Sequence, residues 1–95
     1  MKTFTQRQQA DAISFAINYG QALHLHRIIP ARAPKIFKRY MEAAHLFDID
    51  TARLVTTARA LGVKKVFVHY AGYDRQHIDL CGAPLERARA KCLEE

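Results

Sequence analysis

The stretch HYAGYDRQHIDLCG, residues 69–82, holds the densest group of side chains that could do chemistry. An imidazole can act as a general base when a carboxylate orients it, and imidazole and carboxylate groups together can bind a metal ion. We therefore predict candidate catalytic residues for a small hydrolytic or metal-assisted site, which are His69, Asp74, His77 and Asp79.

The geometry of this site depends on whether residues 65–70 and 77–81 form neighbouring strands. In that case His77, Asp79 and Cys81 project from one face, because side chains alternate along a strand. A cation beside Cys81 would lower its pKa and make it a nucleophile. The alternative is a solvated polar face on an edge strand. The chain has no C-x-x-C or four-ligand zinc pattern, and we predict no metal ligand or cofactor.

Positive charge dominates the first half of the chain. Fifteen Lys and Arg residues oppose nine Asp and Glu residues, for a net charge of +6 and a pI near 9.7. No acidic residue lies between Asp11 and Glu42. This imbalance predicts a surface that binds nucleic acid or another polyanion. Its predicted residues are Arg27, Arg32, Lys35, Lys38 and Arg39.

The remaining composition is that of a small domain outside the membrane. Ninety-five residues suffice for one domain, 1–95, and no apolar run reaches the length of about 20 residues that spans a bilayer. The N-terminus has no apolar signal core, which predicts a cytoplasmic protein. In that compartment Cys81 and Cys92 are expected to be reduced.

Apolar spacing predicts the elements that position these residues. Four helices are expected, the first from Thr3 or Thr5, the second from Pro34 to Ala44, the third from an Asp48 or Asp50 cap to Gly62, and the last from Pro84. Segments 65–70 and 77–81 read as strands, and 23–28 reads equally as a strand or as the end of the first helix. The sequence thus predicts an α-rich α+β domain with about four helices and two or three strands.

Two other functions compete with these hypotheses. A helix-turn-helix would require KKVFVHYAG to be its second helix, but β-branched and aromatic residues favour a strand there. Phe4, Phe15, Phe47 and Phe67 have no obvious place in the predicted core. If two or more of them are exposed together, they would mark a homo-oligomer interface.

From about Ile29 onward, the order of these signals resembles a family of small bacterial proteins catalogued as domain of unknown function 4031. The segments that carry the resemblance are Ile29-Pro30, His45-Leu46 with Asp48 and Asp50 behind it, ARALG at 58–62, VFVHY at 66–70, His77-Ile78-Asp79 and Arg87-Ala88. The resemblance implies a small mixed α/β unit with a polar segment around His77. It implies no activity.

Overall fold

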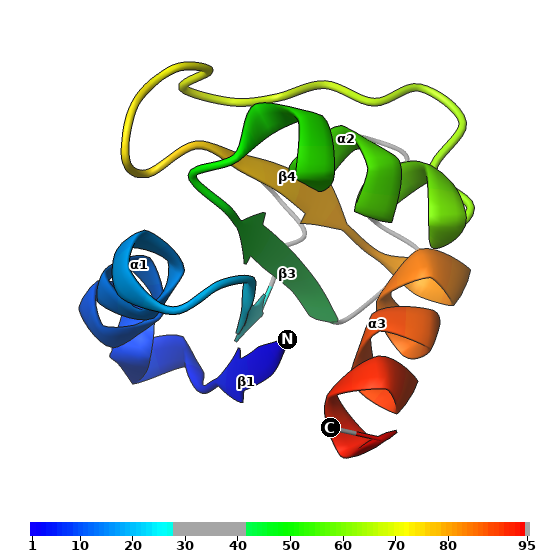
Figure 1. Cartoon of the computed structure of the whole chain (residues 1–95). Helices are drawn as coiled ribbons and strands as arrows, with labels where there is room; N and C mark the ends of the chain where they lie inside the picture. The colour runs from blue at the N-terminus through cyan, green and yellow to red at the C-terminus, as the bar shows by residue number, and fades with distance from the viewer. Residues whose placement is uncertain (28–41, 95) are drawn as a thin grey trace.

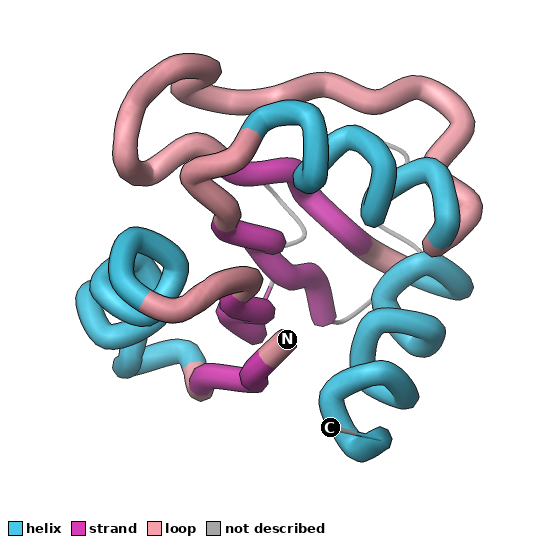
Figure 2. The backbone as a smooth tube through the Cα atoms, in the orientation of Figure 1, coloured by secondary structure: helices cyan, strands magenta, loops and turns pink. Residues whose placement is uncertain are grey.

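Four strands form one mixed sheet in the order β1-β2-β3-β4 in the computed structural model, which describes residues 1–27 and 42–94. Strand β1 (Lys2–Phe4) runs parallel to β2 (Ala22–Arg27). Strand β3 (Glu42–Phe47) is antiparallel to both β2 and β4 (His77–Leu80), as Figures 1 and 2 show.

The main core lies on the face of the sheet that α2 (Thr51–Ala60) and α3 (Gly82–Glu94) cover (Figure 1). Alternate strand residues point into it, because side chains switch faces at each position of a strand. These residues pack against Leu54, Ala58, Leu85 and Ala88 of the helices. The buried strand residues are Leu23, Ala44, Leu46, Ile78 and Leu80.

Helix α2 has the ends that the sequence predicts. The Asp50 carboxylate accepts a hydrogen bond from the Arg53 backbone N–H at 3.0 Å, which satisfies a first-turn amide. Gly62 adopts a φ of +93° after the last turn, and the Val63 N–H then bonds to the Ala58 carbonyl oxygen at 3.0 Å. At the other end of the helix, a short turn capped by Asp50 joins β3 to α2.

Helix α1 (Gln9–Asn18) covers part of the opposite face of the sheet. Its Ala12 and Ala16 pack against Phe4, Ala22 and Phe47, which lie on β1, β2 and β3. A short 3-10 helix (Gln6–Gln8) leads into it, and the Gln8 side-chain oxygen accepts a hydrogen bond from the Thr5 N–H. The rest of this second face carries polar side chains, described below.

The α+β class is confirmed, and the described residues contain three α-helices and four strands. Of the open choice at 23–28, the described residues 23–27 form a strand as part of β2, and residue 28 lies outside the described part. Strand β1 was not predicted. Helix 34–44 is wrong at its end, since residues 42–44 belong to β3; residues 34–41 lie outside the described part. Strand 65–70 is also wrong, because only His69 forms a β-bridge there. Pairing with neighbouring strands, and not local propensity, decides the secondary structure of these segments.

Individual side chains test the predicted packing. Phe4 and Phe47 are buried, whereas Phe67 is 69% exposed. Leu93 is 89% exposed near the end of α3. Both cysteines are free thiols, as predicted. None of the helices in the described ranges is long and apolar enough to cross a membrane.

Candidate metal centre

All five histidines of the chain lie on the sheet face opposite the main core. His24 and His26 alternate along β2, and the strand register places His45 opposite His24. The same register places Asp79 opposite His45, and cross-strand partners share a face. His77 lies two residues before Asp79, and His69 pairs with His77 through the isolated bridge. We call this surface the histidine face; its residues are His24, His26, His45, His69, His77 and Asp79.

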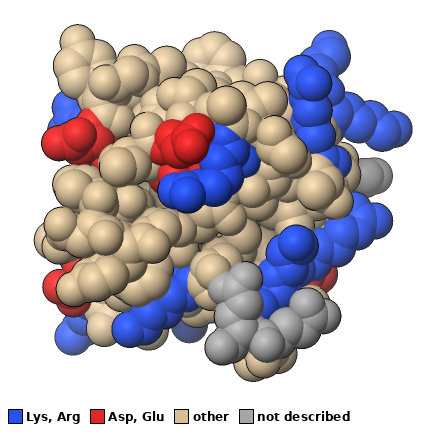
Figure 3. Space-filling model, viewed as in Figure 1, with Lys and Arg blue, Asp and Glu red and all other residues tan. Residues whose placement is uncertain are grey.

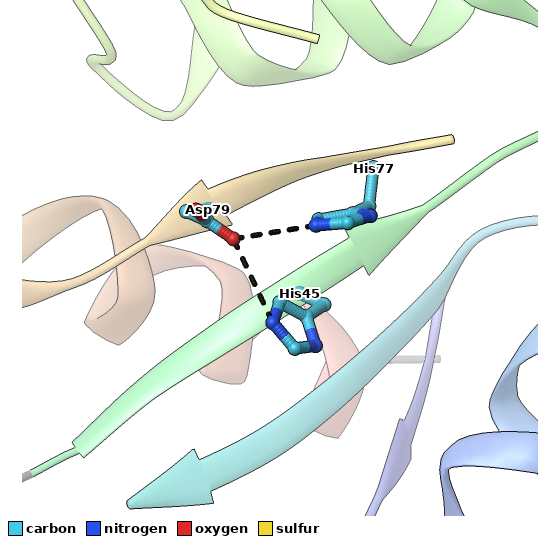
Figure 4. A group of neighbouring side chains, drawn as sticks. All are labelled: His45, His77 and Asp79. Atoms are coloured by element: carbon cyan, nitrogen blue, oxygen red, sulfur yellow. Dashed lines mark ion pairs between the residues drawn. The ribbon is translucent and has the colours of Figure 1, made fainter. Parts of the chain in front are cut away.

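Three of these side chains converge on one point. The ligand atoms of His45, His77 and Asp79 all lie within 4.8 Å of one another. Asp79 Oδ1 is 3.6 Å from His77 Nε2 and 3.7 Å from His45 Nε2 (Figure 4). These distances are too long for hydrogen bonds. They match the spacing of about 3.3–3.6 Å between ligand atoms bound at about 2.0–2.2 Å around a tetrahedral ion.

The backbone fixes the tautomer of His77. Its Nδ1 lies 3.1 Å from the Arg75 carbonyl oxygen. A carbonyl oxygen only accepts hydrogen bonds, so Nδ1 carries the proton of the neutral ring and donates it. Nε2 therefore presents a lone pair toward Asp79. A donated Nδ1–H with a bare Nε2 is the usual arrangement of a metal-binding histidine.

A chain of two hydrogen bonds fixes the tautomer of His45 in the same way. His24 Nε2 lies 3.0 Å from the Gln6 carbonyl oxygen and must donate to it. The Nδ1 of neutral His24 is then an acceptor, and it lies 3.2 Å from His45 Nδ1. His45 Nδ1 must therefore donate, which leaves the lone pair of His45 on Nε2, the atom that faces Asp79.

Asp79 is held from one side and bare on the other. Its Oδ2 lies 3.1 Å from His69 Nε2, a contact between a carboxylate and an imidazole. Its Oδ1 is buried and has no hydrogen-bond partner among residues 1–27 and 42–94. Two imidazole lone pairs and one carboxylate oxygen thus face one another, and no described side chain donates between them. A cation is the group that satisfies such a set.

Burial favours the neutral imidazoles of His45, His77 and His26. Burial, and next the charges of His26, His77 and other histidines nearby, lower the pKa of His45 from 6.5 to about 3. Burial also lowers the pKa values of His77 and His26. Neutral imidazole is the form that binds metal ions. The cluster is therefore ready for a metal at neutral pH without losing protons first.

His26 completes the cluster without belonging to the three converging ligands. Its ring stacks on His45 with centroids 4.2 Å apart. Its Nε2 is buried and makes no hydrogen bond within the described part of the chain. A second unsatisfied polar atom therefore lies beside the candidate ligands.

The structure brings together three of the four predicted catalytic residues. His69, His77 and Asp79 lie in one cluster, while Asp74 is exposed in the turn before β4 and is not among the converging ligands. The structure gives no support to the cysteine hypothesis, because burial and then the Asp79 charge raise the pKa of Cys81. His45 was missed. The alternation of His24 and His26 was its available signal, because a histidine-bearing strand could have been expected to meet another.

The predicted basic surface lies almost wholly beyond what the structure describes. Arg27 is exposed at the end of β2, opposite Glu42. Arg32, Lys35, Lys38 and Arg39 lie outside the described residues. In the view of Figure 3, several Lys and Arg side chains gather toward the right-hand edge of the molecule. The remaining Lys and Arg side chains in this view lie in separate groups, with tan surface between the groups. Polyanion binding through the 27–39 cluster stays a prediction, as does self-association.

Comparisons with protein-family models, curated proteins and solved structures found no match to this chain. The resemblance to the family of unknown function therefore stays a prediction.

Proposed function

We propose that this domain binds a divalent transition-metal ion through His45 Nε2, His77 Nε2 and Asp79 Oδ1, and that it is a metal-assisted hydrolase. The observation that carries the proposal is the convergence of two imidazole lone pairs on a buried carboxylate oxygen that has no donor among the described residues. Such an arrangement is repulsive unless a cation lies between the three atoms.

The ligand set narrows the choice of ion. Imidazole nitrogens suit zinc and its neighbours in the transition series, whereas magnesium and calcium prefer oxygen ligands. Three protein ligands leave at least one position for water, as in catalytic zinc sites; structural sites take four protein ligands.

A zinc-like ion would supply a water nucleophile at neutral pH. In hydrolysis the water oxygen bonds to an electrophilic centre, the bond to the leaving group breaks, and a proton passes to that group.

His69 and His24 act as positioning residues in this proposal. His69 Nε2 contacts Asp79 Oδ2 at 3.1 Å, and this contact holds the carboxylate with Oδ1 toward the two imidazoles. His24 fixes the tautomer of His45, as the hydrogen bonds to Gln6 and His45 require. Neither of them is one of the three converging ligands.

Metal titration tests the proposal directly. Metal-stripped protein is titrated with Co²⁺, followed by visible absorption, and with Zn²⁺, followed by calorimetry. We expect one metal ion to bind per chain. His45→Gln and Asp79→Asn should each weaken metal affinity more than about 100-fold, which exceeds the effect of losing an outer-shell partner.

Asp74→Asn is the matched control for Asp79→Asn. It removes the same charge from an exposed carboxylate five residues away and should bind Co²⁺ as the wild-type protein does. Wild-type affinity weaker than about 1 mM, or an Asp79→Asn variant that binds as tightly as Asp74→Asn, would overturn the proposal.

A further inference from the structure

An exposed segment rich in aromatic and basic residues borders the histidine face. We call residues 63–76, between α2 and β4, the aromatic loop; it crosses the top of the molecule in Figure 1. Its rings are unusually exposed, with Phe67 at 69%, Tyr70 at 55% and Tyr73 at 70%. Its charged side chains, all exposed, are Lys64, Lys65, Asp74 and Arg75, for a net charge of +2.

The aromatic loop is joined to the candidate metal centre by direct ring contacts. The Phe67 ring meets the edge of His69 with centroids 4.7 Å apart. His69 stacks on His77 with ring centroids 5.1 Å apart, and its Nε2 lies 3.1 Å from Asp79 Oδ2. Tyr70 lies 6.1 Å from the His77 ring, and the Arg75 guanidinium lies 4.4 Å above the Tyr70 ring. A ligand on these rings is therefore adjacent to the three converging ligand atoms.

Buried hydrogen bonds hold this loop in place. The Gln76 side chain is fully buried; its oxygen accepts from the Gly72 N–H at 2.9 Å and from the Thr51 hydroxyl at 3.0 Å. Its nitrogen donates to the Asp48 carbonyl oxygen at 2.7 Å. Tyr70 is kept at a φ of +54°, a left-handed conformation that is costly for a bulky residue. Such strain is concentrated at functional sites, where surrounding contacts maintain it.

We infer that the aromatic loop binds single-stranded nucleic acid, with unpaired bases stacked on Phe67 and Tyr73 and a phosphodiester beside His45, His77 and Asp79. This substrate class rests on the proposed function. Exposed flat rings stack on any unpaired base, and the cations between them attract phosphates. A duplex keeps its bases stacked on one another and offers the rings no free face.

Fluorescence anisotropy with a labelled oligothymidine of about 12 nucleotides tests the inference in the presence of EDTA. The wild-type protein should bind it at low salt, at least tenfold more tightly than a duplex of the same length. Contacts from Lys64, Lys65 and Arg75 should give a log–log salt slope of about −2. The double variant Phe67→Ala/Tyr73→Ala should weaken binding about 10- to 100-fold.

Tyr19→Ala is the matched control, since Tyr19 is an 82% exposed ring beside α1, outside the aromatic loop. It should leave strand binding unchanged. No strand binding by the wild-type protein would overturn the inference. Equal affinity for duplex, or no loss in the double variant, would overturn it in favour of a general basic surface.

Crossing the two sets of variants separates this inference from the proposed function. The double variant should bind Co²⁺ like the wild-type protein, because neither Phe67 nor Tyr73 is one of the three converging ligands. Asp79→Asn should lose Co²⁺ binding but still bind the strand. Strand binding without Co²⁺ binding overturns the proposed function and the placement of a phosphodiester at a metal. Co²⁺ binding without strand binding overturns only the substrate class.

Discussion

Two aspartates on neighbouring elements have opposite surroundings. Asp48, just after β3, is fully buried, and four donors satisfy its carboxylate. Arg53 binds both oxygens, through Nε at 2.7 Å and through its terminal nitrogen at 2.6 Å, while the Asp50 N–H and the Gln21 amide complete the set. Asp79, on β4, has only an imidazole contact at Oδ2, from His69 at 3.1 Å, and its buried Oδ1 has no hydrogen-bond partner among the described residues.

This difference separates a carboxylate that stabilises the fold from one that the proposed metal site would use. A buried polar group with all its partners stabilises the fold, whereas one that lacks a partner costs free energy and needs another explanation. Asp48 joins the turn after β3 to α2 and to Gln21, which lies just before β2. Asp79 does no comparable structural task. The surroundings of its Oδ1 are those that the proposed metal site requires of a ligand atom.

The largest expected effect is on stability. Asp48→Ala should lower the free energy of unfolding by about 2–4 kcal/mol, because it leaves the Asp50 N–H and the Gln21 amide without their acceptor and Arg53 without its ion pair. In metal-free protein, Asp79→Ala should change it by less than about 1 kcal/mol, since a poorly satisfied charge is removed. Urea unfolding measures both variants.

Saturating metal should make the two losses of stability comparable. Saturating Zn²⁺ should stabilise the wild-type protein and Asp48→Ala by similar increments, about 2.7 kcal/mol at 100 times the dissociation constant. It should leave Asp79→Ala unchanged. Equal destabilisation by the two substitutions in metal-free protein would contradict the distinction between the two carboxylates.

The helix that follows Asp48 was easier to predict than the strand that precedes it. The helix from Asp50 to Gly62 follows from local signals, a side-chain cap and a glycine end, which the structure confirms. The strand β3 does not, because its sequence continues a helical apolar spacing; pairing with both β2 and β4 decides its conformation. Long-range pairing of this kind leaves little trace in one sequence.

The candidate site shows the same limit. His77 and Asp79 share a local H-x-D spacing on a strand, and His69 is close to them in the chain. His45 comes from a different strand, 32 positions before His77, and only the sheet register brings it alongside Asp79. The tautomer of His45 depends on the carbonyl oxygen of Gln6, which is still further from His77 in the chain. Sequence spacing therefore identified the carboxylate and one imidazole, but not the lone-pair geometry.

The histidine face and the Asp48 network should lose their contributions to stability at different pH values. The folded-state pKa of His45, about 3, lies below its unfolded value of 6.5, so the folded metal-free protein binds fewer protons between these values. Stability should therefore fall as the pH drops below about 6.5, on the order of 2 kcal/mol by pH 5 from His45 alone. His26 and His77 shift in the same direction and add to the loss.

The Asp48 network should respond only at lower pH. Burial raises the pKa of Asp48, but hydrogen bonds from Arg53, the Asp50 N–H and Gln21 outweigh it, and the net pKa is below 3.8. Its contribution is present above the unfolded value and is lost as the pH falls through the folded pKa, hence below about 4. Urea midpoints of wild type and His45→Phe from pH 8 to 4 measure this difference. A wild-type midpoint that stays flat down to pH 4.5 would show that the imidazoles are not held neutral.

The smallest expected effect concerns the tautomer chain. His24→Phe keeps the ring shape but removes the acceptor that obliges His45 Nδ1 to donate. His45 can then place its proton on Nε2, so the metal must select the other tautomer, and Co²⁺ affinity should fall about tenfold.

The Co²⁺ absorption spectrum of His24→Phe should keep its shape, because His45, His77 and Asp79 all remain as ligands. An altered spectrum, or a loss as large as that of His45→Gln, would make His24 a ligand instead of a positioning residue. An unchanged affinity would mean that the Gln6–His24–His45 chain belongs with Asp48, as a stabiliser of the sheet. The comparison between satisfied and unsatisfied polar groups would then have to be drawn between Asp79 and His24, within the histidine face itself.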